Sequence, residues 1–246
     1  MTKHNIGAMT RRILRHFDAA TDEQREQGTS WYRDARTFVA RLAVTSPYSF
    51  RQVADVTAAL SPQVNWEKNM EGTILALDRH ASGDWKGEQL EGYGGYSANA
   101  QKAYRILEGE DALRGPKVEA FGAAIRGDLS HVTVDIWATR AARAERDNIA
   151  RVFADDEQPS VTEHRAIAEA YRRAAGLRGT EPAVVQATVW VVIRESGRWQ
   201  RPQHFTAQER ARFWKRQMRA RAALGLGIPY KWGGHSGEKL AAYVAA

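Results

Sequence analysis

The chain has 246 residues, of which 43% are hydrophobic and 26% are charged, values that are ordinary for a globular protein with its own core. It contains no cysteine, which excludes disulfides, zinc–thiolate sites and iron–sulfur clusters. The net charge is +7, and residues 194–239 alone carry 11 Lys and Arg against 3 Glu. A basic segment on a nearly neutral body indicates a polyanionic partner, with nucleic acid as the first candidate and a solvated helix face as the alternative.

Apolar residues recur at helical spacing along the chain, and runs that alternate between polar and apolar residues are scarce. Ser49 and Ser97 are predicted helix caps, and Pro182 suits the first turn of a helix. The pattern predicts an all-α fold of about ten helices without a substantial sheet. The predicted helices span residues 10–20, 31–44, 49–61, 65–80, 97–109, 117–127, 135–146, 161–176, 180–196 and 206–225.

Several classes of protein do not fit the sequence. The longest apolar stretch, residues 183–193, is too short to span a bilayer, and the first 17 residues lack the apolar core of a secretory signal. The 7 histidines are scattered, and no P-loop, dinucleotide fingerprint or nucleophile elbow is present. We therefore expect a cytoplasmic protein with no membrane partner, no metal and no cofactor.

Four short motifs remain as carriers of chemistry. In "LSPQVNWEKN" (residues 60–69), Pro62 ends a helix and leaves Gln63 in the turn before the next one. "YSANAQKA" (residues 96–103) leads from a tyrosine turn into a helix, and "GPKVEAF" (residues 115–121) opens with Gly115 and Pro116. "VDIWATR" (residues 134–140) places Asp135 at the start of a helix, 18 residues after Lys117. Taken alone, Asp135 is a typical N-cap and Lys117 a solvated lysine.

In their order and spacing these motifs resemble the helix-hairpin-helix DNA glycosylase superfamily (HhH-GPD), of the endonuclease-III-like kind, over residues 48–146. The resemblance implies a two-lobed helical fold. Its central lobe would be residues 45–148, and the second lobe would be residues 1–44 together with 149–246. It further implies a monomer that binds double-stranded DNA, flips a modified or damaged base and cleaves its N-glycosidic bond.

Three departures separate this chain from the family pattern. The hairpin is reduced to Gly115 followed by Pro116, and there is no cysteine cluster. The histidine that the family carries after the aspartate is also absent, and Ile136 follows Asp135 here. Such compact, divergent versions are similar to proteins of phage genomes, which indicates a bacterial or phage-infected cell. Two alternatives stay open on the same fold: a transferase that modifies hypermodified phage pyrimidines, and a DNA-binding protein without catalysis.

The resemblance assigns roles to individual residues. Asp135 would stabilise the positive charge that develops on the sugar, in addition to or instead of capping its helix. Lys117 would attack the sugar and form a Schiff base, which adds AP-lyase activity, with phosphate contact as the alternative. Gln63 would fill the gap left by the flipped base, or lie exposed in its turn. The turn at Gly115 and Pro116 would direct helix amides at a phosphate, or simply join two helices.

The remaining candidates line a pocket or bind DNA. Asn69 is expected in the pocket or tying down the turn, and Trp66 and Trp137 in the pocket or in the core. Tyr96 and Asn99 are expected in the pocket or capping their helix. Trp214 and Met218 form the apolar side of the helix at residues 206–225. Its basic side, the predicted DNA contact, consists of Arg212, Lys215, Arg216 and Arg219.

Overall fold

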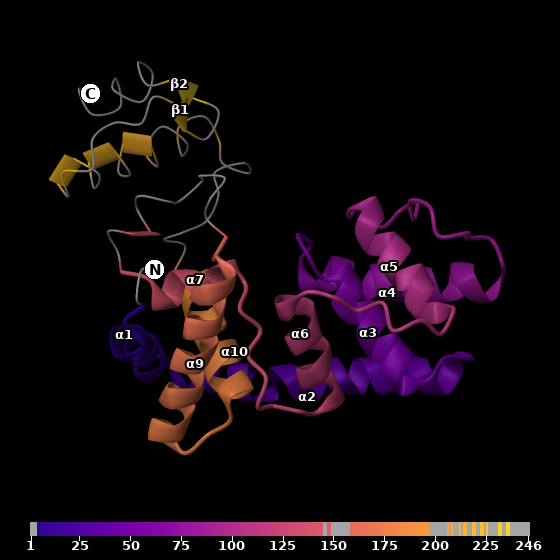
Figure 1. Cartoon of the computed structure of the whole chain (residues 1–246), viewed down its shortest axis with the longest axis horizontal. Helices are drawn as coiled ribbons and strands as arrows, with labels where there is room; N and C mark the ends of the chain where they lie inside the picture. Colours follow the sequence, from indigo (N-terminus) through magenta and orange to yellow (C-terminus); the bar gives the residue numbers. More distant parts are fainter. Residues whose placement is uncertain are drawn as a thin grey trace. The chain divides into compact units, whose positions relative to one another are not determined.

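The computed structural model describes residues 4–144, 147–148 and 158–196, together with single residues between 206 and 236. This part of the chain contains nine helices and one antiparallel pair of two-residue strands, so the predicted all-α class is confirmed (Figure 1). None of these helices has both the length and the apolar composition of a membrane span. The elements are α1 (Ile6–Asp18), α2 (Asp22–Thr45), α3 (Phe50–Leu60), α4 (Trp66–Ala81), α5 (Ser97–Leu107), α6 (Pro116–Arg126), α7 (Ile136–Ala142), α9 (Val161–Arg178), α10 (Pro182–Glu195), β1 (Lys231–Trp232) and β2 (His235–Ser236).

Local sequence signals fix most helix ends. Ser49 caps α3 through a capping box with Gln52, as predicted, and Pro182 is the first residue of α10. The predicted cap at Ser97 is wrong. Tyr96 is the last residue with an extended backbone (φ −73°, ψ 141°), so Ser97 already lies in the first turn of α5. α5 therefore begins without a side-chain cap.

The chain divides into two compact units, and each is described by itself below. Unit 1 consists of residues 1–20, 135–170 and 189–246, and unit 2 consists of residues 21–134 and 171–188. These bounds differ from the predicted lobes at three places, one of which is residues 171–188, predicted in the second lobe but grouped with unit 2. Residues 21–44 belong with unit 2 because α2 packs against α3 and α6. Residues 135–148 belong with unit 1, where α7 packs against α1.

Helix α3 is the centre of unit 2. Every residue from 53 to 60 is buried, and α3 contacts α2, α4, α5 and α6 (Figure 1). A helix that is buried on all sides needs mostly small or apolar residues, which the stretch "VADVTAAL" supplies, and its one charged residue, Asp55, is paired with Arg126. Gly28 allows α2 to approach α10, because a Cβ atom at this position would lie only 2.7 Å from the Thr188 backbone nitrogen. The core of unit 2 thus joins segments from both of its parts.

Unit 1 is held together by contacts between distant segments. In α1, Ile13 is fully buried, and the Thr10 hydroxyl donates to the carbonyls of Ile6 (2.9 Å) and Ala170 (3.4 Å). Arg143 forms a buried, bidentate ion pair with Glu163, with N–O distances of 2.8 and 2.9 Å. Buried charges are stable only when they are paired and hydrogen-bonded, and here both conditions are met.

Candidate functional site

Gln63 lies exposed in the turn between α3 and α4, with its backbone in the left-handed region at φ 67°. No other described residue apart from glycines has a positive φ, and this conformation costs roughly 1–2 kcal/mol for a residue with a Cβ. The Tyr96 hydroxyl donates a hydrogen bond of 2.7 Å to Gln63 Oε1. Tyr96 is itself 55% exposed. The structure therefore brings together two predicted site residues that belong to different motifs and lie 33 positions apart in the sequence.

Tyr93 also supports this turn, although it was not among the predicted site residues. Its side chain is buried, and its hydroxyl donates to the carbonyl of Leu60, the last residue of α3, which has no partner within the helix. Burial raises the pKa of Tyr93 to about 12, so the hydroxyl keeps the proton that it donates. Its ring contacts Gly72 and Gly95, where any side chain would collide with it. A tyrosine between glycines, in "GYGGY", is the sequence signal that indicates such close packing.

Asn69 is more deeply buried than Asn99. Asn69 is 2% exposed, and its Oδ1 accepts no hydrogen bond from the described residues. Because it makes no such bond, this oxygen does not tie down the turn. A buried acceptor without a partner costs about 1–3 kcal/mol of stability, which indicates a role other than folding. Asn99 lies half-buried in the first turn of α5.

Trp66 packs in an aromatic cluster within unit 2. Its ring centroid lies 5.1 Å from that of Trp31 and 5.9 Å from that of Phe38, both on α2. Aromatic pairs at such distances stabilise a core beyond the area that they bury. Of its two predicted roles, the structure supports packing for this residue.

The hairpin before α6 is held by bonds within unit 2. Gly115, at φ 119°, donates its backbone N–H to Glu119 Oε1 at 3.1 Å. Lys102, from the "YSANAQKA" motif, donates to the carbonyl of Arg114 at 3.0 Å. The amide that the sequence offers to a phosphate is therefore occupied by a carboxylate, which a phosphate would have to displace. Lys117 follows the exposed Pro116 and is half-buried.

Asp135 is the N-cap of α7, as predicted. Its Oδ1 accepts a hydrogen bond of 2.8 Å from the backbone nitrogen of Ala138, and its side chain keeps partial exposure. Trp137 is half-buried in the first turn, and the guanidinium of Arg140 lies 4.6 Å from the centre of its ring. Asp135 belongs to unit 1 and Lys117 to unit 2, and the contacts of each side chain are those within its own unit.

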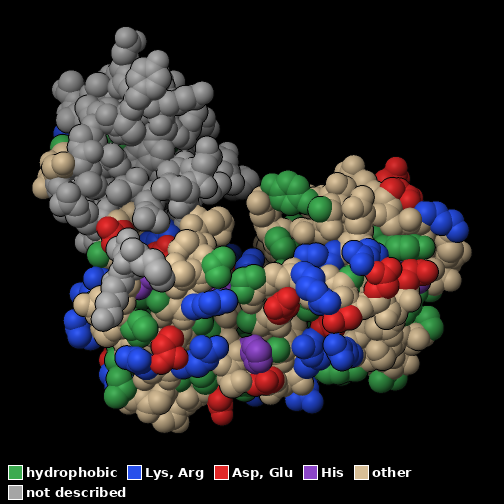
Figure 2. Space-filling view, in the orientation of Figure 1, with side chains coloured by type: hydrophobic (Ala, Val, Ile, Leu, Met, Phe, Trp, Pro, Cys, Tyr) green, Lys and Arg blue, Asp and Glu red, His purple; other side chains and the backbone are tan. Residues whose placement is uncertain are grey.

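The C-terminal basic segment is described at single positions. Trp214 and Met218 are buried, Arg212 and Arg219 are exposed, and Lys215 is half-buried, which agrees with the predicted two-sided helix. Arg216 lies outside the described residues. On the face shown in Figure 2, basic and acidic side chains lie interspersed over the described helices. Within the described ranges, no three His, Asp or Glu side chains converge as a metal site would require.

Comparison with known proteins gives one match. A family of unknown function, DUF7178, matches residues 1–197 of the chain. No curated protein and no solved structure matches the chain.

Proposed function

The chain belongs to DUF7178, a family of unknown function, and we propose that it is a DNA-binding enzyme that flips a modified or damaged base and cleaves its N-glycosidic bond. The proposal includes a monomer with a two-lobed helix-hairpin-helix fold that acts on double-stranded DNA in the cytoplasm. It rests on the four ordered motifs and on the surroundings of three of their residues.

The carboxylate of Asp135 is the observation that carries the proposal. One of its oxygens is held by the Ala138 amide at 2.8 Å, and the side chain is still partly exposed. When an N-glycosidic bond breaks, the base leaves with the bonding electrons and the sugar carbon becomes positively charged. A fixed carboxylate stabilises that charge without having to reorganise during the reaction.

Gln63 supports the base-flipping step. A base that leaves the stack leaves a gap in the duplex, which an inserted side chain fills. Gln63 is exposed on a left-handed turn and is braced by the Tyr96 hydroxyl, so its position is defined before any DNA is bound. A preformed insertion residue loses less conformational entropy on binding than a mobile one.

Lys117 decides between two forms of the reaction. If its amine attacks the sugar carbon, the base is replaced by a covalent imine and the strand can then be cut. If water attacks, the product is an abasic site and Lys117 serves as a phosphate contact. The Glu119 carboxylate on the Gly115 amide is a further departure from a phosphate-binding hairpin.

A mass-spectrometric screen for released bases tests the proposal, with a panel of oligonucleotides that carry damaged and modified bases. In Asp135→Asn we expect release to fall by about 10²–10³-fold while DNA binding stays within about twofold. Asparagine caps helices as well as aspartate does, so this variant separates the charge from the cap. Full activity in Asp135→Asn would rule out the proposed mechanism.

Borohydride trapping on the cleaved oligonucleotide separates the two roles of Lys117. A trapped adduct that is lost in Lys117→Ala identifies the amine as the nucleophile. A transferase would instead require a second substrate and leave no abasic site, and a protein that only binds DNA would give no product from any oligonucleotide.

A further inference from the structure

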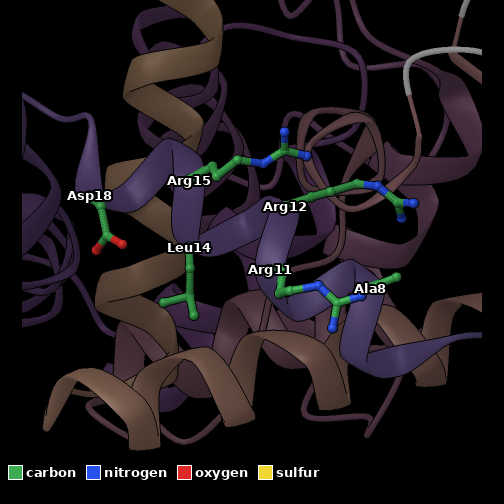
Figure 3. A pocket seen from close by; sticks show the side chains of 6 residues that line it. All are labelled: Ala8, Arg11, Arg12, Leu14, Arg15 and Asp18. Atoms are coloured by element: carbon green, nitrogen blue, oxygen red, sulfur yellow. The ribbon is translucent and has the colours of Figure 1, made fainter.

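Helix α1 carries three arginines on one face, beside a pocket of about 420 Å³ (Figure 3). Arg11 and Arg15 lie about one turn apart on the exposed face of α1, opposite to buried Met9 and Ile13, and half-buried Arg12 lies at the edge of that face. In Figure 3 their side chains extend to the same side of the helix, whereas Asp18 points away from them. None of the sequence motifs includes these residues.

The three arginines form no salt bridge with a described residue. Like charges at three- and four-residue spacing repel and destabilise a helix. On α4, by contrast, Lys68 pairs with Glu71 three residues further on, at 3.1 Å. The pocket is lined by these three arginines and by one carboxylate, Asp18, and such an excess of positive charge favours binding of an anion.

Arg12 connects this cluster to the helix of Asp135. Its Nη1 donates a hydrogen bond of 3.1 Å to the carbonyl of Ala142, the last residue of α7, which has no partner within that helix. This bond fixes the guanidinium and leaves other N–H groups of Arg12 for a ligand. Asp135 caps the opposite end of α7, about 10 Å away at 1.5 Å per residue.

We propose that Arg11, Arg12 and Arg15 bind phosphates of the DNA backbone beside the nucleotide on which Asp135 acts. This inference rests on the proposed function for its choice of ligand. Guanidinium groups pair with phosphate oxygens through two parallel hydrogen bonds, which an ammonium group cannot reproduce. The rise of about 10 Å along α7, from Asp135 to the carbonyl that Arg12 binds, equals roughly three steps of duplex rise at 3.4 Å each, which is compatible with phosphates close to the target nucleotide.

The salt dependence of duplex binding, measured by fluorescence anisotropy, tests this inference. For Arg11→Ala/Arg15→Ala we expect the slope of log affinity against log salt to become shallower by about 1 for each phosphate that an arginine no longer neutralises. Arg11→Lys/Arg15→Lys keeps the charge, and we expect it to retain the slope with a weaker affinity. Arg41→Ala removes an exposed arginine of α2 as the matched control, and we expect no change. An unchanged slope in the double alanine variant overturns the inference.

Two further measurements separate this inference from the proposed function and from binding of a small anion. Base release reports on Asp135, so a panel without release but with the shallower slope refutes the function and leaves the arginine site standing. Normal base release with an unchanged slope refutes the arginine site and leaves the proposed function standing. Inorganic phosphate is added alone to the full chain. In one outcome, phosphate stabilises the wild-type chain against heat but not the double alanine variant, while the DNA slope of that variant is unchanged. This result would assign the arginines to a free anion and overturn the assignment to the DNA backbone.

Discussion

In unit 2, several polar groups of the predicted motifs are hydrogen-bonded, whereas in unit 1 the arginines of α1 have no carboxylate partner among the described residues. Gln63 is braced by Tyr96, and the Gly115 amide is taken by Glu119. Arg11 and Arg15, by contrast, are exposed cations beside a pocket. Three of the four sequence motifs lie in unit 2, but uncompensated charge is the better physical sign of an anionic ligand, because it lowers stability unless a ligand is bound.

The largest expected effect concerns the buried ion pair of unit 1. It tests whether a buried charge there needs a partner that the exposed arginines of α1 do without. Glu163→Gln removes the counter-charge of Arg143, whose side chain is 3% exposed. We expect the free energy of unfolding in urea to fall by about 3–5 kcal/mol. The matched control is Asp34→Asn, which breaks the exposed pair with Arg33 in unit 2, and we expect a loss of no more than about 1 kcal/mol. Equal losses in the two variants would contradict this account.

The next prediction concerns the buried acceptor of unit 2. Asn69→Leu removes an oxygen that has no hydrogen-bond partner among the described residues, so we expect a gain in the free energy of unfolding of about 1 kcal/mol together with weaker base release. The same change at Asn65, four residues earlier, removes the cap of α4 and should lower stability by about 1 kcal/mol. A loss of stability in Asn69→Leu would mean that its oxygen has a structural partner.

A smaller effect should appear in the pH dependence of unit 1. Burial lowers the pKa of His164 from 6.5, and its Nε2 has no described partner. The unfolded chain therefore binds this proton more readily than the folded protein does. The stability that His164 contributes is present above pH 6.5 and is lost as the pH falls through the lowered folded value.

Urea midpoints between about pH 5 and pH 8 measure this effect, since that window brackets the ordinary histidine pKa. We expect His164→Leu to flatten the profile. A wild-type profile without a decline below pH 6.5 would mean that His164 is accommodated as a cation.

The smallest effect is expected at the hairpin of unit 2. Glu119→Gln keeps an oxygen for the Gly115 amide but removes a negative charge from the turn. If DNA approaches this hairpin, affinity should rise roughly two- to threefold at low salt, because repulsion of the phosphates is reduced. Glu26→Gln, an exposed glutamate on α2, is the control. The same gain in both variants would show a general effect of net charge rather than contact at the hairpin.

Much of the fold was predictable because its signals are local. Helical spacing indicated the all-α class, Pro62 the break after α3, and Ser49 and Asp135 the caps of α3 and α7. The error at Ser97 has the same origin. Both Tyr96 and Ser97 are compatible with a helix start, and side-chain preference alone did not identify the residue at which the backbone becomes helical.

The candidate site was predictable only in part. The sequence by itself determined which residues start helices and which carry charge. The tertiary structure alone decided that Trp66 packs with Trp31, that Tyr96 reaches Gln63, and that Arg12 closes the end of α7. Helix formation and capping depend on neighbours within one turn. These contacts instead join residues between 33 and 130 positions apart, so they follow from the packing of a whole unit.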